Sequence, residues 1–305
     1  MSETVYDVVI IGVGPAGIQA AIHASRKKTS VLVLGRIENS ALYAAHIENY
    51  ACIDGVTEGR DMLKAGVSQI TRFGAEVWSE DVLKIEQAED QLFDLELESG
   101  RRVRARSLIF SMGVSKKKLS VPGEKELSGR GVSYCVDCDA NFYRGATVMV
   151  AGNRSAAVDG ALTLLGYADK VYLVARELKG SDSLLKRLSE SEVEVLEGTW
   201  VKEISGENAV TEVVLENDTT VKVDGIFIEL GSKGALELAT RIGVMLDTEH
   251  FKYIDVTRKQ ETNIPGVYAA GDIVGPPYQM AKAVGEGCVA GMEAAGYARK
   301  QKRAQ

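Results

Sequence analysis

The feature that most constrains the fold lies near the N-terminus. A run rich in β-branched residues, Val5–Ile11, is followed at once by the turn "GVGPAG", then by the helical pattern "AGIQAAIHASRKK" and by a second strand, "SVLVLG". Gly12, Gly14 and Gly17 therefore have the G-x-G-x-x-G spacing inside a strand–helix–strand unit. In that context the glycines permit a tight turn, the close approach of a pyrophosphate, and close packing of helix on strand. The segment predicts a dinucleotide-binding turn.

The same order of elements occurs a second time. Residues 145–177, "GATVMVAGNRSAAVDGALTLLGYADKVYLVARE", repeat the strand, turn, helix and strand. Short alternating segments between residues 77 and 110, and again between 193 and 230, predict antiparallel meanders with turns at "SG" and "ND". The C-terminal "QMAKAVGEGCVAGMEAAGYARKQ" has a helical period with basic residues near its end. The chain is thus expected to be an α/β protein with two copies of a nucleotide-binding topology.

Length and composition exclude several classes of protein. The 305 residues are about twice the ~150 expected for one domain, and apolar (45%) and charged (26%) residues occur at ordinary frequencies. No stretch approaches the ~18 apolar residues of a membrane span, and the N-terminus lacks the features of a secretory leader, so a cytoplasmic protein is expected. The net charge of −7 argues against binding nucleic acid or anionic lipid.

Two local basic runs stand out against this acidic background. They are "RRVRAR", residues 101–106, and "SKKKLS", residues 115–120. A solvated rim is the commoner meaning of such runs, and the alternative is a patch for an acidic partner.

Two of the four cysteines stand close together in "VSYCVDCDANF", and an acid follows the second. A zinc site needs about four ligands, but Cys52 and Cys288 are isolated and the three histidines show no ligand spacing, so no metal is expected. A structural disulfide closing so short a loop would gain little stability. The spacing of Cys135 and Cys138 places both sulfurs on one face of a helical turn, whose N-terminus lowers a thiol pKa from its usual ~8.5. Redox chemistry is therefore favoured, and the isolated cysteines are interpreted as small buried hydrophobes.

Six motifs carry a resemblance to a known family. In order along the chain they are "GVGPAG", "ENY", "SMGVSKKKLSVPGE", "GRGVSYCVDCDANFYRG", "TNIPGVYAAGDI" and "GEGCVAG". Their order and spacing resemble those of the low-molecular-weight thioredoxin reductases over nearly the whole chain. The resemblance implies FAD, a homodimer, and two Rossmann-like three-layer α/β domains with the second inserted into the first. It places the FAD domain at residues 1–115 and 247–305, and the domain with the cysteine pair at 116–246.

The resemblance also implies residue roles. Cys138 is the sulfur nearest the flavin, Cys135 exchanges with the disulfide of a thioredoxin-like substrate, and Asp139 is the proton donor. From the residues alone, Asp139 could equally be an N-cap or a surface acid. At the end of the second strand, Gly35 and Arg36 stand where an acid commonly binds the adenosine ribose. The expected FAD-binding residues are Gly12, Gly14, Pro15, Ala16, Gly17, Gly35, Arg36, Asn49, Gly113, Gly271, Asp272, Gln279 and Met280.

The second glycine-rich turn departs from the pattern. If its strand ends at Val150, the three special positions are Ala151, Asn153 and Ala156. Alanine resists the backbone angles of the tight turn, and the asparagine side chain occupies the path of a pyrophosphate. The family's arginines for the 2′-phosphate of NADPH also fall on "ARELKGS", where only Arg176 survives. Losing two charge-assisted bonds of ~1.5 to 3 kcal/mol each weakens binding about a hundredfold to ten-thousandfold, so NADPH is not expected to be the donor.

Three kinds of electron transfer remain open. In the first, another carrier such as ferredoxin supplies the electrons, and the basic runs would suit its acidic surface. In the second, Glu177 binds an unphosphorylated ribose and NADH is used. In the third, the pair oxidises a small dithiol and the flavin passes electrons to oxygen. A flavin-bearing sensor without enzymatic activity fits poorly with an intact cysteine pair and its acid.

Overall fold

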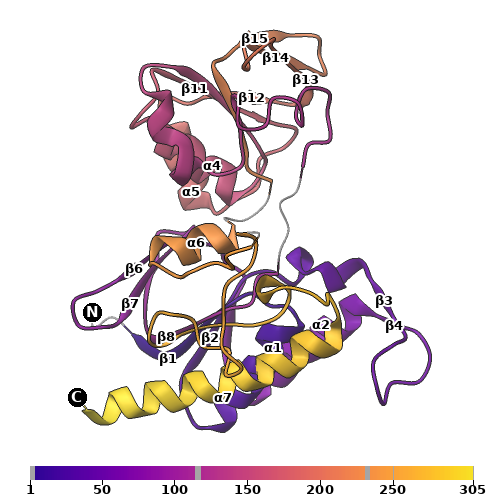
Figure 1. Cartoon of the computed structure of the whole chain (residues 1–305), viewed down its shortest axis with the longest axis vertical. Coiled ribbons are helices and arrows are strands. Elements are labelled where there is room, and N and C mark those ends of the chain that lie inside the picture. The colour runs from indigo at the N-terminus through magenta and orange to yellow at the C-terminus, as the bar shows by residue number, and fades with distance from the viewer. Residues whose placement is uncertain (1–3, 114–117, 231–233, 250, 305) are drawn as a thin grey trace. The chain divides into compact units, whose positions relative to one another are not determined.

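A computed structural model describes residues 4–113, 118–230, 234–249 and 251–304 of the chain. It divides into two compact units: residues 1–97, 101–115 and 234–305 form the first, and residues 98–100 and 116–233 form the second. Figure 1 shows the helices and strands of each unit. Because the first unit contains both ends of the chain, the second unit is an insertion within it. Among the described helices, none is both long and apolar enough to cross a membrane.

The return to the first unit comes earlier than expected. It lies at 233–234, whereas the sequence suggested 246–247. Helix α6 (Ala235–Arg241) follows this crossing, and its Leu238 and Ala239 are fully buried in the core of the first unit. Apolar burial of α6 therefore draws the segment into the first unit. The expected boundary at 115–116 lies outside the described residues.

The first unit is built on a seven-stranded sheet in the order β5-β2-β1-β8-β7-β6, with β17 also paired to β8. Strands β5, β2, β1, β8 and β17 pair in parallel, while β6, β7 and β8 form the expected antiparallel meander. The turn at Gly100 has the positive φ, 81°, that suits glycine. The strand bounds are β1 (Val5–Ile11), β2 (Val31–Leu34), β5 (Glu76–Trp78), β6 (Val82–Gln87), β7 (Phe93–Leu97), β8 (Arg102–Phe110) and β17 (Val267–Ala269).

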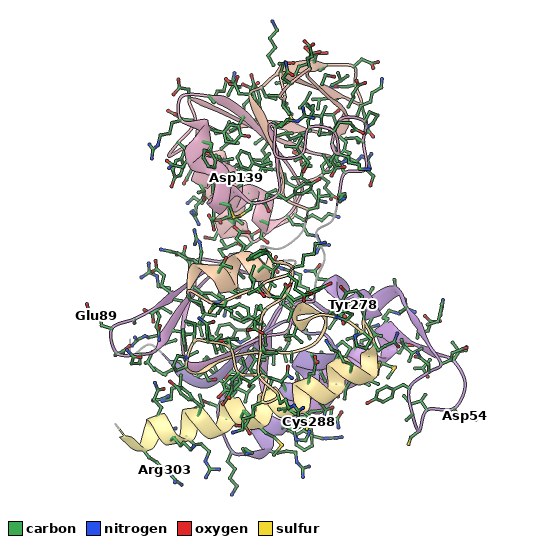
Figure 2. All side chains as sticks on the ribbon, viewed as in Figure 1. Asp54, Glu89, Asp139, Tyr278, Cys288 and Arg303 are labelled. Atoms are coloured by element: carbon green, nitrogen blue, oxygen red, sulfur yellow. A yellow bond between two sulfur atoms is a disulfide. The ribbon has the colours of Figure 1, made fainter. Side chains whose placement is uncertain are left out.

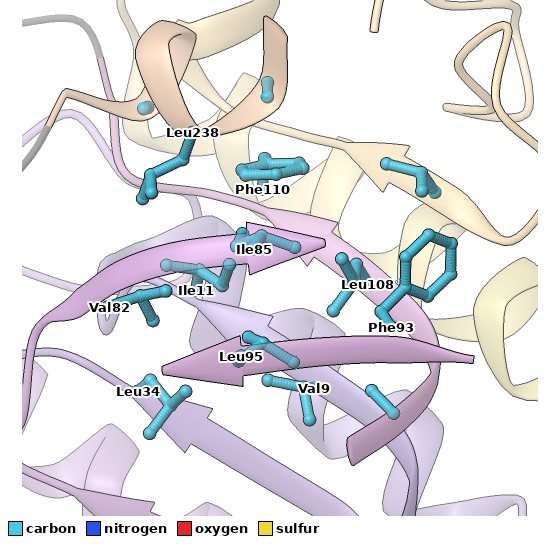
Figure 3. Close-up of a cluster of buried hydrophobic side chains, with 14 of the residues drawn as sticks. Val9, Ile11, Leu34, Val82, Ile85, Phe93, Leu95, Leu108, Phe110 and Leu238 are labelled. Carbon is cyan, nitrogen blue, oxygen red and sulfur yellow. The ribbon is translucent and has the colours of Figure 1, made fainter. Parts of the chain in front are cut away.

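Side chains of β1 alternate between two hydrophobic clusters, as expected for a strand with both faces covered. Val9 and Ile11 belong to the cluster of Figure 3, together with side chains of the meander and Leu238 of α6. Val8 and Ile10 belong to the other cluster, which α1 and α7 cover. The first unit thus has the three layers expected of a dinucleotide-binding fold.

The long C-terminal helix lies directly against the helix of the first glycine-rich turn (Figure 1). A Cβ added at Gly287 would lie 2.2 Å from the Ala16 carbonyl oxygen, and one at Gly291 would lie 2.3 Å from that of Ala20. Only glycine permits so close an approach of the two backbones. The remaining elements of this unit are α1 (Pro15–Arg26), α2 (Gly59–Arg72), α7 (Met280–Ala304), β3 (His46–Ile47), β4 (Thr57–Glu58) and the 3₁₀ turns η1 (Ile37–Asn39), η2 (Ala41–Ala44) and η4 (Asp272–Val274).

The second unit repeats the strand–helix–strand order on a five-stranded parallel sheet, β12-β11-β10-β16-β9. A three-stranded antiparallel sheet, β13-β14-β15, supplies the second expected meander. The elements are β9 (Val132–Ser133), α3 (Val136–Asp139), η3 (Ala140–Tyr143), β10 (Thr147–Ala151), α4 (Ser155–Leu164), β11 (Lys170–Ala175), α5 (Asp182–Ser189), β12 (Glu194–Glu197), β13 (Val201–Ser205), β14 (Glu212–Leu215), β15 (Thr220–Lys222) and β16 (Gly225–Ile228). The predicted α/β fold with a repeated nucleotide-binding topology is confirmed.

Candidate functional site

The first glycine-rich turn is tightly packed on one side and open on the other. Gly12 has φ +119°, and a Cβ there would lie 2.5 Å from the Ser111 carbonyl oxygen. A Cβ at Gly17 would lie 2.0 Å from the Gly12 carbonyl oxygen, so helix α1 can pack against β1 only through glycine. A Cβ at Gly14, the N-cap of α1, would meet only Ser40 Oγ at 3.5 Å. The open side therefore lies at the helix N-terminus, where free N–H groups favour an anion.

The end of β17 lies beside this turn. A Cβ at Gly271, which has φ +88°, would lie 3.1 Å from Ala16 Cβ. Asp272 follows directly, and burial raises the pKa of its carboxyl while the charge of Lys282 opposes the shift. The structure thus places the end of β17 against the first glycine-rich turn, with Gly271 beside Ala16.

An ion pair on α7 holds the backbone at Gly271 and Gly275 in place. Glu286 accepts from the Gly271 N–H (2.9 Å), and Lys282 donates to the carbonyl oxygens of Gly271 (2.8 Å) and Gly275 (2.6 Å). Lys282 and Glu286 also pair with each other at 3.1 Å and are largely buried. Sequence reasoning missed both residues, although their opposite charges at i and i+4 after a Gly-Asp turn were a usable signal.

Gly35 is another expected cofactor residue that lies beside this turn. A Cβ at Gly35 would lie 3.7 Å from Gly12 Cα. Arg36 Nη1 pairs with the buried Asp81 at 2.8 Å. Asn49 Nδ2 donates to Gln279 Oε1 at 3.2 Å, immediately before Met280, where α7 begins. Gly113 has φ +73° and follows β8 within three residues.

The cysteine pair lies in the second unit, next in sequence to Asp139, which Figure 2 labels. Cys135 and Cys138 form a disulfide with their Cα atoms 5.3 Å apart. Cys135 is the N-cap of α3, and its Sγ accepts from the Cys138 N–H at 3.2 Å. Cys138 is exposed and Cys135 half-buried. The Cys135 sulfur therefore has a backbone N–H donor at the start of α3.

Two side chains that sequence reasoning missed hold the turn around the disulfide. Ser133 Oγ donates to Asp139 Oδ2 at 2.6 Å and accepts from the Cys135 N–H at 3.2 Å. Glu229, after β16, accepts from the Val136 N–H at 3.3 Å and is 7% exposed. Glu229 is 93 residues from Val136 in the chain, so only the fold brings these groups together.

The second glycine-rich turn is shifted by one residue from the predicted register. Strand β10 ends at Ala151, and Arg154 is the N-cap of α4. In the first copy, the strand ends at Ile11 and the helix N-cap is Gly14. The special positions are therefore Gly152, Arg154 and Ala157. Gly152 meets the requirement for glycine, because a Cβ there would lie 2.1 Å from the Glu229 carbonyl oxygen. The prediction of alanine at the tight turn was wrong, and the main departure is Arg154 at the second position.

The loop after β11 lies against this turn. The Lys179 N–H donates to the Asn153 carbonyl oxygen at 2.8 Å, and Lys179 pairs with Glu177 at 2.8 Å. Arg176 pairs with Glu216 at 2.5 Å. That pair is exposed and contributes only ~0 to 1 kcal/mol, so it does not by itself withhold Arg176 from a ligand.

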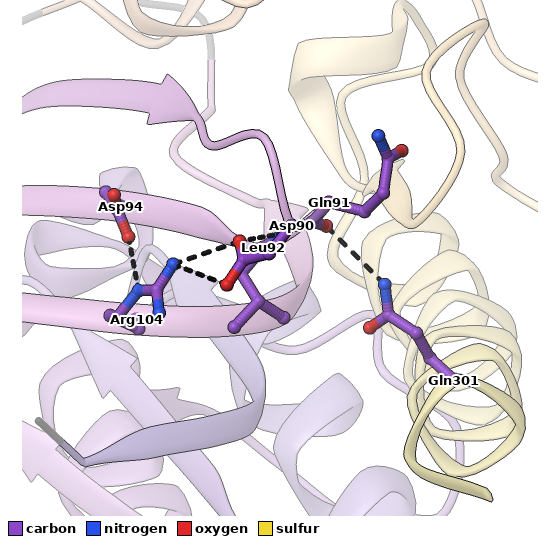
Figure 4. A network of polar contacts seen from close by, with 6 residues as sticks. All are labelled: Asp90, Gln91, Leu92, Asp94, Arg104 and Gln301. Carbon is purple, nitrogen blue, oxygen red and sulfur yellow. Dashed lines mark hydrogen bonds and ion pairs between the residues drawn. The ribbon is translucent and has the colours of Figure 1, made fainter. Parts of the chain in front are cut away.

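Three of the four arginines in the basic run at residues 101–106 pair with acids of the first unit. Arg101 pairs with Glu80 and stacks on Trp78, and Arg106 pairs with Asp7. Figure 4 shows Arg104 bound to both Asp90 (3.0 Å) and Asp94 (2.7 Å). The run is therefore not a strip of unpaired positive charge. In the second run, Lys116 and Lys117 lie outside the described residues.

The isolated cysteines differ from expectation. Cys52 is exposed in the loop between β3 and β4, and Cys288 on α7 is half-buried. The prediction that both are buried hydrophobes was wrong, because residue type alone does not place a cysteine when its loop leaves the core. Among the described residues, no cluster of three or more His, Cys, Asp or Glu side chains could hold a metal ion.

Known proteins match the chain over most of its length. The family model of pyridine nucleotide-disulphide oxidoreductases matches residues 6–287. The thioredoxin reductase of Listeria innocua is 33% identical, covering 99% of this chain and 97% of that protein. Among solved structures, the atypical thioredoxin reductase TRi from Desulfovibrio vulgaris Hildenborough has a TM-score of 0.82 at 33% identity, covering 96% of this chain and 98% of that chain. A ferredoxin-flavin thioredoxin reductase from Clostridium acetobutylicum has a TM-score of 0.69 at 33% identity, covering 97% and 99%.

The predicted family is therefore confirmed, and with it the cofactor class, because thioredoxin reductases are FAD flavoproteins. The geometry fits such a cofactor: an open helix N-terminus, a glycine cradle and an acid meet in one unit. The chain belongs to the pyridine nucleotide-disulphide oxidoreductase family, as a thioredoxin reductase-like, flavin-dependent disulfide oxidoreductase.

Proposed function

We propose that the chain reduces the disulfide of a thioredoxin-like protein, using electrons that pass through FAD and the Cys135–Cys138 pair from a donor other than NADPH. The single observation that carries this function is the disulfide at the N-cap of α3. The relatives named thioredoxin reductase support the choice of substrate.

The proposed FAD site lies in the first unit, where the first glycine-rich turn meets the end of β17. The N–H groups at Gly14 and the start of α1 would hold the pyrophosphate, and Asp272 would bond the ribityl chain. Asn49, Gln279 and Met280 would border the isoalloxazine end, with Gly35, Arg36 and Gly113 around the rest of the cofactor. When bound, FAD supplies a two-electron carrier between the donor and the disulfide.

The cysteines divide the exchange chemistry between them. In the dithiol form, the Cys135 thiolate attacks the substrate disulfide, forming a mixed disulfide and releasing one substrate thiolate. The Cys138 thiolate then attacks Cys135 Sγ, which restores the Cys135–Cys138 bond and releases the second substrate thiolate. Two electrons leave the pair, and the departing thiolates take up two protons. Asp139 would hold and deliver one of these protons.

The second nucleotide fold motivates the exclusion of NADPH. At Arg154, a Cβ and a long side chain stand where the second glycine would let a pyrophosphate approach the backbone. The family's later arginine has no counterpart in the loop after Arg176, and the carbonyl of Asn153 is engaged by Lys179. The same turn weighs against NADH, and Glu177 already has a cationic neighbour in Lys179.

Ferredoxin is the donor we favour. The support is the similarity to a ferredoxin-flavin thioredoxin reductase. The arginine run on β8 lends no support, because Arg101, Arg104 and Arg106 are paired with acids. A homodimer in the cytoplasm completes the proposal, and analytical ultracentrifugation of the holoprotein tests the dimer.

Anaerobic titration tests the donor. Reduced ferredoxin should bleach the flavin absorbance within seconds, whereas NADPH and NADH at the same concentration should leave it unchanged. Rapid bleaching by NADPH would contradict the reading of the second turn. With small dithiols as substrates, oxygen consumption that exceeds thioredoxin turnover would instead indicate a dithiol oxidase.

A further inference from the structure

Ser133 occupies a fixed position next to the redox disulfide. It is the second residue of β9, where it pairs with Phe227 of β16, and it is 4% exposed. Its hydroxyl oxygen lies 2.6 Å from Asp139 Oδ2 and 3.3 Å from the Cys135 carbonyl oxygen, and it accepts from the Cys135 N–H at 3.2 Å. One buried hydroxyl therefore reaches both the acid and the backbone of the first cysteine.

A serine hydroxyl has one proton to donate and two lone pairs to accept with. When Asp139 is ionised, the Ser133 proton is best placed on its carboxylate, because a charge-assisted bond is the stronger one. When Asp139 is protonated, the acid can donate to Ser133 Oγ while the hydroxyl turns its own proton to the Cys135 carbonyl oxygen. Both acceptors lie within reach without movement of a heavy atom.

We propose that Ser133 is the positioning residue of Asp139, holding its carboxyl group in one place in both protonation states by reversing the direction of their hydrogen bond. This inference rests on the proposed function, in which Asp139 gives up and regains a proton in each cycle. Without Ser133 the ionised acid loses more than the neutral acid does, because a donor to a carboxylate is worth more than an acceptor for a neutral group. Asp139 would then keep its proton to higher pH.

Other titratable groups also face this turn. Asp137 lies on α3 itself, and Glu229 accepts from the Val136 N–H. Burial is the main cause that raises the pKa of the Tyr143 phenol in η3, and the charge of Asp139 is the second cause. All three groups remain in place when Ser133 is replaced. Their influence on the pH profile therefore cancels when a Ser133 variant is compared with the wild type.

The test follows the opening of the disulfide by dithiothreitol in the anaerobic full-length holoprotein between pH 5 and 9. A dithiothreitol thiolate attacks one sulfur, the other leaves and takes a proton, and ring closure of the reagent releases the first sulfur, so two electrons pass to the protein. Alkylation and mass analysis of Cys135 and Cys138 give the rate. Dividing each variant's rate by the wild-type rate at the same pH cancels the contribution that dithiothreitol ionisation makes to the pH dependence.

If Asp139 delivers the proton, its loss slows the reaction and produces a descending limb, and this limb should move to higher pH in Ser133→Ala, because the ionised carboxylate loses a donor. Ser133→Thr, which keeps the hydroxyl, should restore it. Ser191→Ala is the matched control, because Ser191 also donates one bond (2.7 Å) and accepts one (3.3 Å) in the same unit, and its profile should overlie the wild type.

A Ser133→Ala rate that differs from wild type by one constant factor at every pH would overturn the inference. Asp139→Asn separates this outcome from failure of the proposed function. If Asp139→Asn removes the limb while Ser133→Ala leaves it in place, Ser133 is not the positioning residue. If Asp139→Asn keeps the limb, Asp139 is not the proton donor, and both the inference and that part of the mechanism fail.

Discussion

At the scale of single residues, Gly14 and Gly17 separate ligand binding from folding within one turn. Gly17→Ala should lower the free energy of unfolding by about 1 to 3 kcal/mol or more, because its Cβ would lie 2.0 Å from the Gly12 carbonyl oxygen. Gly14→Ala should unfold like wild type when FAD-free, since Gly14 is in an extended conformation and its nearest contact is 3.5 Å away. Urea unfolding and the FAD content after purification measure both effects.

The Gly14→Ala protein should nonetheless retain less FAD than wild type, because its methyl group stands on the open side of the turn. Full FAD occupancy in that variant would show that the pyrophosphate binds elsewhere.

Asp272 gives a pH dependence with a definite sign. Burial raises the pKa of its carboxyl above the ordinary 3.8, so the folded state holds the proton more readily than the unfolded chain. Stability from this group is full below pH 3.8 and is lost as pH rises through the raised pKa. FAD-free Asp272→Asn should therefore match wild type in acid and exceed it in unfolding free energy near neutral pH.

Urea unfolding of the FAD-free proteins between pH 4 and 8 measures the difference. Asp218→Asn is the control and should show no gain at neutral pH, because Lys202 lowers the pKa of that carboxyl. A gap between Asp272→Asn and wild type that widens toward acid would contradict the assignment.

The sequence could identify those site residues that carry a local signal, and it missed those whose role depends on partners distant in the chain. Gly12 and Gly17 follow from spacing, because backbone geometry restricts those positions to glycine, whereas Gly271 was expected only from the family resemblance. Ser133 and Glu229 carry no local signal, since a buried serine or glutamate acts through partners that only the fold supplies. The one-residue error at Gly152 arose because the end of a β-branched run does not fix where a strand ends.

At the scale of elements, the contact of α1 with α7 depends on small residues. Gly291→Ala should lower the free energy of unfolding by about 1 to 3 kcal/mol, because its Cβ would lie 2.3 Å from the Ala20 carbonyl oxygen. Gly296→Ala on the same helix meets nothing within 4 Å and should raise stability by about 0.5 to 1 kcal/mol through helix propensity. Urea denaturation compares the two, and equal destabilisation would contradict this packing.

Strands, helices and meanders were predictable because their hydrophobic periods are local. The C-terminal pattern from Gln279 indicated a helix, and α7 spans Met280–Ala304. Helix α6 was not predicted. It is seven residues long, and packing on the core of the first unit, rather than a long amphipathic pattern, holds it.

At the scale of the whole molecule, the chain carries two copies of one fold that differ in their functional residues. The first retains a glycine cradle beside an acid, and the second has Arg154 at the corresponding N-cap and carries a disulfide in the turn after β9. The sequence indicated this division because both turns follow strands in the same order. It did not place the return to the first unit, since that depends on where α6 packs.

The proposed function requires electrons to pass from FAD to the cysteine pair, and counting thiols measures this transfer. FAD in the anaerobic holoprotein is photoreduced with about two electron equivalents from EDTA, which is oxidised as the sacrificial donor, and free thiols are then alkylated and counted. In wild type, thiols should appear at both Cys135 and Cys138 as the yellow colour returns. In Cys135→Ser the flavin should stay bleached. A wild-type flavin that stays bleached over an intact Cys135–Cys138 disulfide would contradict the account.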